Sequence, residues 1–492
     1  MRYHPMVILF QIYQLVKENV LFALVLFVFQ KDSDFWLFVY GKYVFVAYVS
    51  LRFIYIVSSW FVETYEWQDR TFYLKKGVLT KKTMTIPFSK IQNVTKKTTL
   101  FHKLFGLTSL YFETVLDGED STIVFPVVTK QQATKIVVMV NVQEGKEVVK
   151  EKEKEKTEKV DPSIPEQEVR SDSTIHYEPT SKDLLKASFT SLSFLIIIPI
   201  ISGLYDIFES FITQYQGIFK DSLSILSLSI VVVIIAISIG VIRTFLKYGE
   251  YRISSNDSRI FIDRGVVEKS QFAIEKRKVQ GIEIKQNVMT RMFGLVEVTL
   301  ISSFNPEVED SDVSVNSLYP FLPVKKAYQL IEELLPGYYV HQSMQRLARA
   351  SLWMKLIKPS WLWLIATACL IYFKPTVFKI ESTWWLASLV LLIIVVVNRL
   401  LDYWHTKYLI AGDQVQWWHG GLVSKLFLTK RKNIIEMGYS QSVLQRILKL
   451  GSITTMNRSN PTRIETVADV PTEFIQSFQR WYKDRQADIH NQ

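Results

Sequence analysis

The chain has 492 residues, of which 48% are hydrophobic and 21% are charged, and its formal net charge is +11. This length allows about three domains, and the composition fits membrane segments that alternate with polar domains. Its single cysteine, Cys369, excludes disulfides and cysteine metal sites.

Hydrophobic segments near the length needed to cross a membrane come in three pairs along the chain. In chain order they are 5–16 (at the interface, continuing as a span over 18–30), 35–59, 187–205, 225–244, 360–373 and 383–398. Tryptophans flank the third pair like an interfacial aromatic belt. The sequence therefore predicts a multi-pass α-helical membrane protein with six spans.

The short connections inside the three pairs contain four Lys and Arg residues in total, and the segments outside the pairs contain nearly all the others. The positive-inside rule therefore predicts a cell-membrane protein with both termini and the regions between the pairs in the cytoplasm. Arg52, Arg243 and Arg399 fall near the cytoplasmic helix ends. A charge inside a membrane segment can be functional, but their matching depth favours snorkelling membrane-edge anchors.

A β-rich block follows each hydrophobic pair. Each block alternates polar and apolar residues over short runs and then has a helical pattern, at 128–140, 323–335 and 471–482. This pattern predicts about 80 residues of antiparallel sheet closed by one C-terminal helix. The expected organisation is 1–62 (first transmembrane pair), 63–142 (first block), 143–178 (charged disordered linker), 179–248 (second pair), 249–338 (second block), 339–405 (third pair) and 406–485 (third block).

The blocks share motifs at fixed spacing, which identifies them as repeats. Each opens with a glycine turn, assigned to Gly77, Gly265 and Gly421, and the next apolar anchor follows 14, 14 and 13 residues later. Positive φ is expected at Gly77. The first two blocks close with Lys103-Leu-Phe-Gly-Leu107 and Arg291-Met-Phe-Gly-Leu295. The third block departs, with Lys449 in place of the closing glycine and Ile435 in place of a central glutamine.

Residues 144–159 contain six Glu and six Lys, and two prolines follow them. Such a polyampholyte buries too little apolar surface to become ordered, so the segment is expected to be a linker. The distance from Gly77 to Gly265 exceeds that from Gly265 to Gly421 by 32 residues, which is close to the length of this segment.

Basic residues concentrate in the blocks: residues 70–103 contain nine Lys or Arg and no Asp or Glu. A domain beside a bilayer meets anionic lipid before nucleic acid, which is not an expected partner, and each near-surface Lys or Arg contributes about 1 kcal/mol of attraction. The bias of cytoplasmic segments toward positive charge could by itself also account for these residues. The candidate lipid or partner contacts are Lys75, Lys76, Lys81, Lys82, Lys96, Lys97, Lys103, Lys276, Arg277, Lys278 and Arg291.

The turn glycines, the central Ile-Gln or Val-Gln and the Lys/Arg-x-Phe-Gly-Leu close resemble the bacterial PH-like domain family. Three such domains, each behind two membrane helices, resemble the YdbT-type membrane proteins of Gram-positive bacteria. The resemblance implies a bent antiparallel sheet with one capping helix in each block. It also implies a smaller companion PH-like membrane protein and a role in immunity against membrane-active bacteriocins.

No catalytic motif, metal motif or phosphate-cradling loop is present in the sequence, so neither enzyme activity nor a cofactor is expected. His102 has no counterpart in the other blocks and is expected at the surface. The main hypothesis is a non-enzymatic membrane protein whose PH-like domains act as interaction modules at the inner leaflet and contribute to envelope protection. The alternative is a component of lipid or peptide transport.

Overall fold

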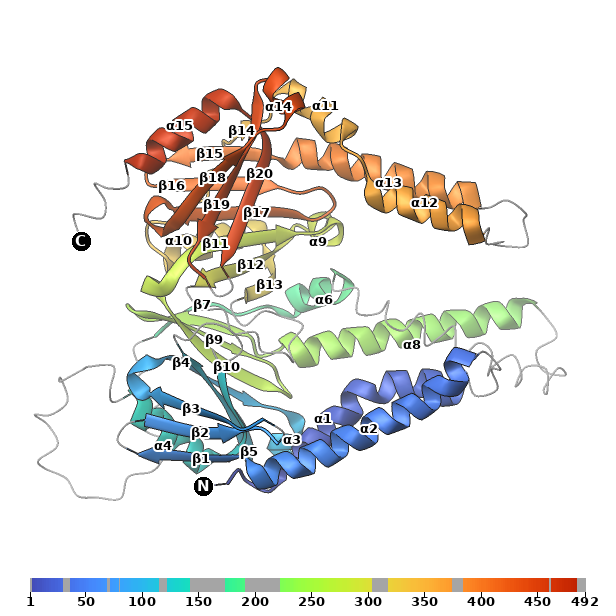
Figure 1. Cartoon of the computed structure of the whole chain (residues 1–492), viewed down its shortest axis with the longest axis vertical. Helices are drawn as coiled ribbons and strands as arrows, with labels where there is room; N and C mark the ends of the chain where they lie inside the picture. The colour runs from blue at the N-terminus through green and yellow to red at the C-terminus, as the bar shows by residue number, and fades with distance from the viewer. Residues whose placement is uncertain are drawn as a thin grey trace, which may run out of the picture. The chain divides into compact units, whose positions relative to one another are not determined.

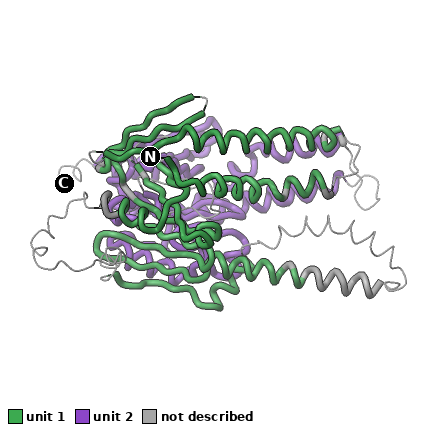
Figure 2. Tube along the Cα trace, turned by 90° about the horizontal axis from the view of Figure 1, so that it is seen from below, with its two compact units in different colours: residues 1–273 green, residues 274–492 purple. Residues whose placement is uncertain are grey.

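The structure is a computed structural model that describes residues 2–29, 36–68, 71–78, 80–114, 122–141, 173–190, 222–302, 317–373, 384–459 and 462–484 (Figure 1). The chain divides into two compact units, Met1–Ala273 and Ile274–Gln492 (Figure 2). The boundary falls inside the second block. The charged segment 144–159 and most of the expected span 187–205 lie outside the described residues.

Unit 1 contains the first block and the first strands of the second. Its elements up to the linker are α1 (Met6–Leu24), η1 (Val25–Phe29), α2 (Trp36–Val62), β1 (Thr64–Gln68), β2 (Thr71–Lys76), β3 (Lys82–Pro87), η2 (Phe88–Lys90), β4 (Ile91–Thr98), α3 (Leu100–Leu104), β5 (Leu107–Thr114), β6 (Thr122–Thr129) and α4 (Lys130–Asn141). Then follow β7 (Thr174–Tyr177), α6 (Ser181–Thr190), α8 (Ser222–Tyr248), β8 (Arg252–Ser255), β9 (Arg259–Arg264) and β10 (Lys269–Glu275), whose last two residues lie beyond the unit boundary.

Unit 2 continues the second block and contains the third. Its elements up to the third block are η6 (Lys276–Lys278), β11 (Val279–Gln286), α9 (Val288–Met292), β12 (Leu295–Ser302), β13 (Ser317–Pro323), α10 (Val324–Leu334), β14 (Gln345–Arg346), α11 (Arg349–Ile357), α12 (Trp361–Phe373) and α13 (Trp384–His405). The third block consists of β15 (Lys407–Ala411), β16 (Gln414–His419), β17 (Ser424–Lys430), η7 (Arg431–Asn433), β18 (Ile434–Ser440), α14 (Val443–Ile447), β19 (Leu450–Asn457), β20 (Arg463–Pro471) and α15 (Thr472–Lys483).

All three blocks follow one plan: three antiparallel strands, a 3-10 turn, one strand, a short helix, two more strands and a C-terminal helix. The sheets cross the block boundaries. In unit 1 the second half of the first block and the first half of the second form one sheet, in the order β6-β5-β4-β10-β9-β8-β7. In unit 2 the order β13-β12-β11-β17-β16-β15-β14 repeats this arrangement for the second and third blocks. Strands β4 and β11 thus pair with the block that follows them.

The core of the first block lies between β1-β2-β3 and β4-β5-β6. Alternate residues of the strands point inward, so Phe72, Leu74 and Ile86 pack with Phe112 and Phe125. All five side chains are at most 2% exposed. The third block is built in the same way around Trp417, Phe427 and Phe478. The first and third blocks are therefore antiparallel β domains with a C-terminal helix, as the sequence predicted.

The N-terminal segment completes the core of the first block. Tyr3, Val7 and Phe10 are buried in it, and the Trp60 indole N–H donates to the Tyr3 carbonyl at 3.0 Å. Rings of Phe10 and Phe101 lie 5.5 Å apart. The first half of α1, expected at the membrane interface, therefore packs against a polar domain.

The prediction of a multi-pass helical protein with six spans is wrong. Among the described residues, three helices are long and apolar enough to cross a membrane: 38–62, 349–372 and 384–405. The chain is instead rich in strands, which form four sheets in the part that the structure describes. One physical reason is visible in α1, where apolar residues counted as membrane-facing serve the core of the first block.

Candidate functional site

Each block has a turn between its second and third strands, and this turn packs on the end of the helix that precedes the block. In the second block, the Gly265 amide donates to the Gly249 carbonyl at 3.2 Å, and the Val266 amide donates to the Leu246 carbonyl at 3.2 Å. Leu246 lies in the last turn of α8, and Gly249 directly follows the helix. Helix ends have unsatisfied carbonyl groups, and this turn supplies donors to them.

The turn of the third block is held by side chains of α13. The Gly420 amide donates to Asp402 Oδ1 at 2.9 Å, and the Leu422 amide donates to Asn398 Oδ1 at 2.9 Å. Lys355 of α11 pairs with the same aspartate. In the first block the Gly77 amide hydrogen-bonds the carboxylate of Glu63, directly after α2. Burial raises the pKa of the Glu63 carboxyl, against the opposing effects of Lys76 and the Gly77 amide.

The three turns have one geometry, and it corrects the assignment in the third block. Gly77, Gly265 and Gly420 have φ of 98°, 90° and 114°. A Cβ atom on each would lie about 2 Å from the carbonyl oxygen three residues later, so only glycine fits. Positive φ at Gly77 was expected. The equivalent residue in the third block is Gly420 rather than Gly421, which makes the spacing to Ile434 14 residues, as in the other blocks.

The first turn has the strongest positive charge. Lys75 and Lys76 end β2, Lys81 directly precedes Lys82 at the start of β3, and Lys76 lies opposite Lys82 on the two strands. Lys75, Lys81 and Lys82 are exposed. These four lysines, hereafter the first-turn lysines, lie where the block meets the end of α2, a candidate span.

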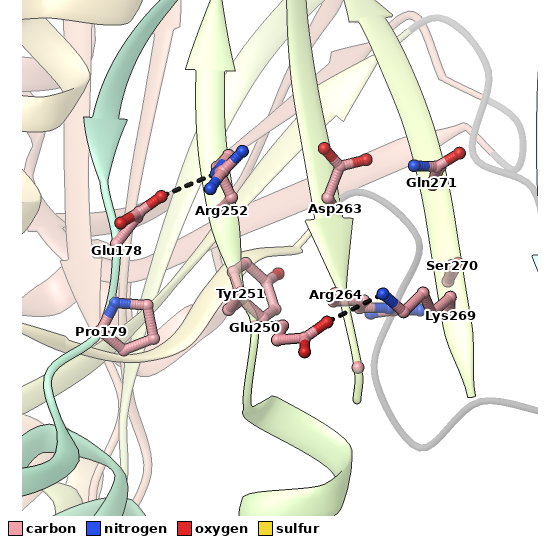
Figure 3. Close-up of a pocket in the computed structure, with 11 residues that line it drawn as sticks. Glu178, Pro179, Glu250, Tyr251, Arg252, Asp263, Arg264, Lys269, Ser270 and Gln271 are labelled. Atoms are coloured by element: carbon pink, nitrogen blue, oxygen red, sulfur yellow. Dashed lines mark hydrogen bonds and ion pairs between the residues drawn. The ribbon is translucent and has the colours of Figure 1, made fainter. Parts of the chain in front are cut away.

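The second turn is balanced by acidic side chains. A cavity of about 430 Å³ beside it is lined by residues of β8, β9 and β10. Figure 3 shows two ion pairs there, Arg252–Glu178 at 2.7 Å and Lys269–Glu250 at 2.9 Å. The basic residues Arg252 and Lys269 of this cavity therefore have acidic neighbours.

Several other candidate residues lie at the junctions between blocks. Lys96 and Lys97 of β4 pair with Gln271 and Ser270 of β10. The Lys103 ammonium donates to the Val266 carbonyl at 3.0 Å. The matching Arg291 donates from Nη2 to Ser424 Oγ at 2.9 Å. A basic residue on the short helix of one block thus reaches the turn region of the next block, a contact that sequence reasoning did not anticipate.

The remaining candidates are scattered. Lys276, Arg277 and Lys278 form the 3-10 turn η6, where Lys278 pairs with Glu275 at 3.1 Å. Arg52 and Arg243 are exposed on α2 and α8. Arg399 of α13 donates to the Leu356 carbonyl at 2.8 Å, near the end of α11. The assignment of these three arginines as membrane-edge anchors stays a prediction.

His102 is buried, so the expectation that it lies at the surface is wrong. Its side chain is 0% exposed, and Nδ1 accepts from the Thr99 amide in a capping box of α3. Its Nε2 lies 2.9 Å from the Pro126 carbonyl. Burial lowers the pKa of His102. Thr290 and Gln445 occupy the same place in the capping boxes of α9 and α14, so capping explains why three different residues occur here.

Comparison with known proteins agrees with this architecture. The profile of the family described as bacterial PH domain matches residues 12–142, 184–337 and 362–486. The chain belongs to the bacterial PH domain family. It is 28% identical over 461 residues to the UPF0699 transmembrane protein YdbT of Bacillus subtilis (strain 168), covering 89% of this chain and 90% of that protein. No solved structure matches. The chain is thus a membrane-associated protein with PH-like domains, similar to YdbT, and neither name denotes an enzyme.

Proposed function

We propose that this chain is a non-enzymatic scaffold of the cell membrane whose first block binds anionic lipid headgroups through the first-turn lysines. The observation that supports this proposal is the hydrogen bond between the Gly77 turn and Glu63, directly after the candidate span of α2. A turn in this position lies within reach of headgroups. Four lysines there would contribute several kcal/mol, because each is worth about 1 kcal/mol near an anionic surface.

In this proposal the three blocks have different tasks. The first turn faces lipid, whereas the second and third turns receive Lys103 and Arg291 from the preceding block. Strand pairing between blocks makes them act together as a docking platform. Both termini and all blocks would lie on the cytoplasmic side, because the basic residues concentrate in the blocks.

A test uses the full-length chain in lipid nanodiscs, with either zwitterionic or phosphatidylglycerol-containing bilayers. Hydrogen–deuterium exchange of residues 71–87 should slow in the anionic bilayer, and added salt should reverse the effect, because exposed charges are screened over about 8–10 Å. A fragment starting at residue 64 would not serve, since Tyr3, Val7 and Phe10 complete the core of the first block.

Lys81→Gln with Lys82→Gln should abolish most of the difference between the two bilayers. The matched control is Lys130→Gln with Lys135→Gln, which removes two exposed lysines from α4 of the same block. Equal exchange in both bilayers for the unmodified chain would contradict the lipid contact.

We also propose that the scaffold protects the cell envelope against membrane-active bacteriocins, together with a smaller companion PH-like membrane protein. Support comes from the resemblance to the YdbT-type proteins. A strain that lacks this chain should become more sensitive to such peptides, and complementation should restore resistance. Unchanged sensitivity, together with lipid transfer by the purified chain between vesicles, would favour the transport alternative.

A further inference from the structure

The strand pairing that joins consecutive blocks leaves one strand at each end of the described series of blocks with an edge that is not used in a junction. In both junctions the first strand of a block's second half pairs with the third strand of the next block, as β4 with β10 and β11 with β17. The corresponding strands at the two ends are β18 in the third block and β3 in the first. Within the part of the chain that the structure describes, each of these two strands pairs on one side only.

The two junctions share one register. In unit 1, Lys269 lies opposite Thr98, four residues after the turn glycine and seven after the first residue of β4. In unit 2, Ser424 lies opposite Gln286, again four residues after Gly420 and seven after the first residue of β11. Because the register repeats, it predicts how a further junction of this kind would be paired.

Strand β18 is far more exposed than its counterpart β11. Val279 and the residues from Gly281 to Ile284 are buried in β11, which pairs on both sides, whereas only Ile434 is buried in β18. Ile435 and Tyr439 are 51% and 58% exposed. The Ile435 carbonyl accepts from the Tyr482 hydroxyl at 2.8 Å, whereas from Glu436 to Ser440 the described strand pairs with β19 alone. A strand that pairs on one side only and has exposed apolar side chains is a template for strand addition.

A basic residue, Arg446, lies near the same edge. Lys103 and Arg291 lie three residues before the closing glycine and reach the turn region of the next block. Arg446 holds this position in the third block, three residues before Lys449, and is exposed. Among the described residues, no hydrogen-bond partner occurs for its guanidinium group. Such a partner would be supplied by the turn of one more block.

We propose that β18 of one copy of this chain pairs with β3 of a second copy, in the register of the two internal junctions. Thr83 of the second copy then lies opposite Tyr439, Lys82 lies opposite Ser440, and Arg446 reaches the turn at Gly77. A second copy is the fitting occupant because its β3 occupies the same place in its block as β10 and β17. The lysine in β3 is compatible with pairing, since Lys425 lies opposite Lys285 inside unit 2.

The contact is heterologous, because two different strands meet. This asymmetry allows a sharp cross-linking test in full-length chains that carry Cys369→Ala. One differently tagged chain carries Thr83→Cys and the other carries Tyr439→Cys. Directly opposite residues on antiparallel strands are close enough for a disulfide. Mild oxidation of the mixture in membranes should give a dimer, whereas each variant alone should not.

The matched control pairs Thr83→Cys with Ile435→Cys, on the same exposed side of β18 but four residues out of register, about 13 Å away. We expect at least about tenfold less dimer from the control. Equal yields from both mixtures, or no dimer from either, would overturn the proposal. So would capture of a different protein at Tyr439→Cys in place of a second copy.

Arg446→Ala gives an independent measure, because this side chain is exposed and its guanidinium group has no hydrogen-bond partner among the described residues. Loss of its hydrogen bond to the next turn should lower the in-register yield about fivefold. An unchanged yield would show that Arg446 does not contact the next turn as Lys103 and Arg291 do. The mass of unmodified chains in nanodiscs should correspond to more than one copy, and a monomer there would contradict the pairing. Neither readout depends on lipid contact at the first-turn lysines.

Discussion

The junction between the first and second blocks and the junction between the second and third use the same register but differ in extent. In unit 1, β4 and β10 pair over three residues each. In unit 2, β11 and β17 pair over six. Side chains add to the second junction: Thr429 Oγ1 and Asn433 Nδ2 both donate to the Gln280 carbonyl, at 2.7 and 2.9 Å. One repeated plan therefore gives one short and one long junction.

A buried ion-pair cluster also belongs to the second junction. Glu283 of β11 is 1% exposed and is paired with Arg463 of β20 and Lys285. Arg463 also binds Glu465, which His419 contacts at 3.1 Å. Burial opposes the ionisation of Glu465, but His419 and Arg463 outweigh burial and lower the pKa of this carboxyl. In the first junction the residue equivalent to Glu283 is Thr95, an uncharged residue. Charge pairing thus distinguishes the two junctions.

The largest effect is expected from Arg463→Ala. Glu283 would stay buried with Lys285 as its remaining partner, and breaking a buried pair of this kind costs about 3 kcal/mol. Thermal unfolding of the solubilised chain and amide exchange in β11 would measure the loss. In the first junction, Lys103→Met should cost less than about 1 kcal/mol, because the Lys103 contact is exposed. Equal losses would show that the two junctions do not differ as described.

A smaller effect is expected from Gly281→Asn, which gives the second junction the residue that the first has at Asn93. A Cβ atom at Gly281 would lie 2.9 Å from the Leu428 carbonyl oxygen and 3.0 Å from the Phe427 ring. Overpacking of this kind costs about 1–3 kcal/mol. Amide exchange in β11 and β17 should become faster, while β4 and β10 should be unaffected. Unchanged exchange in β17 would mean that close approach at Gly281 is dispensable.

The closing turn offers a test that leaves side-chain contacts intact. Lys449 has φ of 52°, close to the 67° of Gly106 and the 65° of Gly294. A left-handed residue other than glycine costs about 1 kcal/mol. Lys449→Gly should therefore stabilise the third block by about 1 kcal/mol in thermal unfolding. Gly294→Lys should destabilise the second block by a similar amount, because a Cβ atom there meets no neighbour within 4 Å.

The smallest effect is a pH dependence confined to the first block. His102, next to Lys103, is buried, and burial lowers its pKa; Lys97 lowers it further, whereas the Pro126 carbonyl and Glu268 oppose the shift. The unfolded chain therefore takes up a proton at about pH 6.5, before the folded chain does. Stability of the first block should fall as the pH drops below that value.

Amide exchange of α3 and β5 at two pH values, corrected for intrinsic rates, would measure this loss. The control is His102→Gln, since Gln445 Oε1 accepts from the Ser442 amide at 2.9 Å in the third block. Its Nε2 donates to Ser452 Oγ at 3.1 Å, as His102 Nε2 approaches Ser109. The variant should fold and lose the pH dependence. A pH effect that persists in it would assign the titration to another group.

Local features of the blocks could be predicted from the sequence, because they are encoded in neighbouring residues. The alternation of polar and apolar residues predicted the strands, and the positive φ of Gly77 and Gly265 agrees with the turn motif. The doublet Gly420-Gly421 was misassigned, since adjacent glycines are indistinguishable until the backbone is known. His102 was misplaced because a capping role depends on the N-cap residue three positions earlier, which differs among the blocks.

Long-range features were not predictable in this way. Alternation shows that β4 and β10 are strands, but it does not say that they pair across about 170 residues. The first half of α1 was assigned to the membrane because an apolar side chain suits either lipid or a protein core. Its actual partners, such as Phe101, are distant in the sequence. The sequence also did not show that the candidate basic residues fall into two groups, the first-turn lysines and the junction residues, because the junction contacts are made with residues distant in the sequence.

Sharing sheets between blocks has a consequence for biosynthesis. Strand β4 leaves the ribosome about 170 residues before β10, its neighbour in the sheet. At about 5–20 residues per second, its outer edge stays unpaired for roughly 10–35 s. During that time Lys96 and Lys97 stand on an open edge, where lysines discourage adventitious strand addition. The same side chains that join two finished blocks thus protect the nascent chain while the second block is still being made.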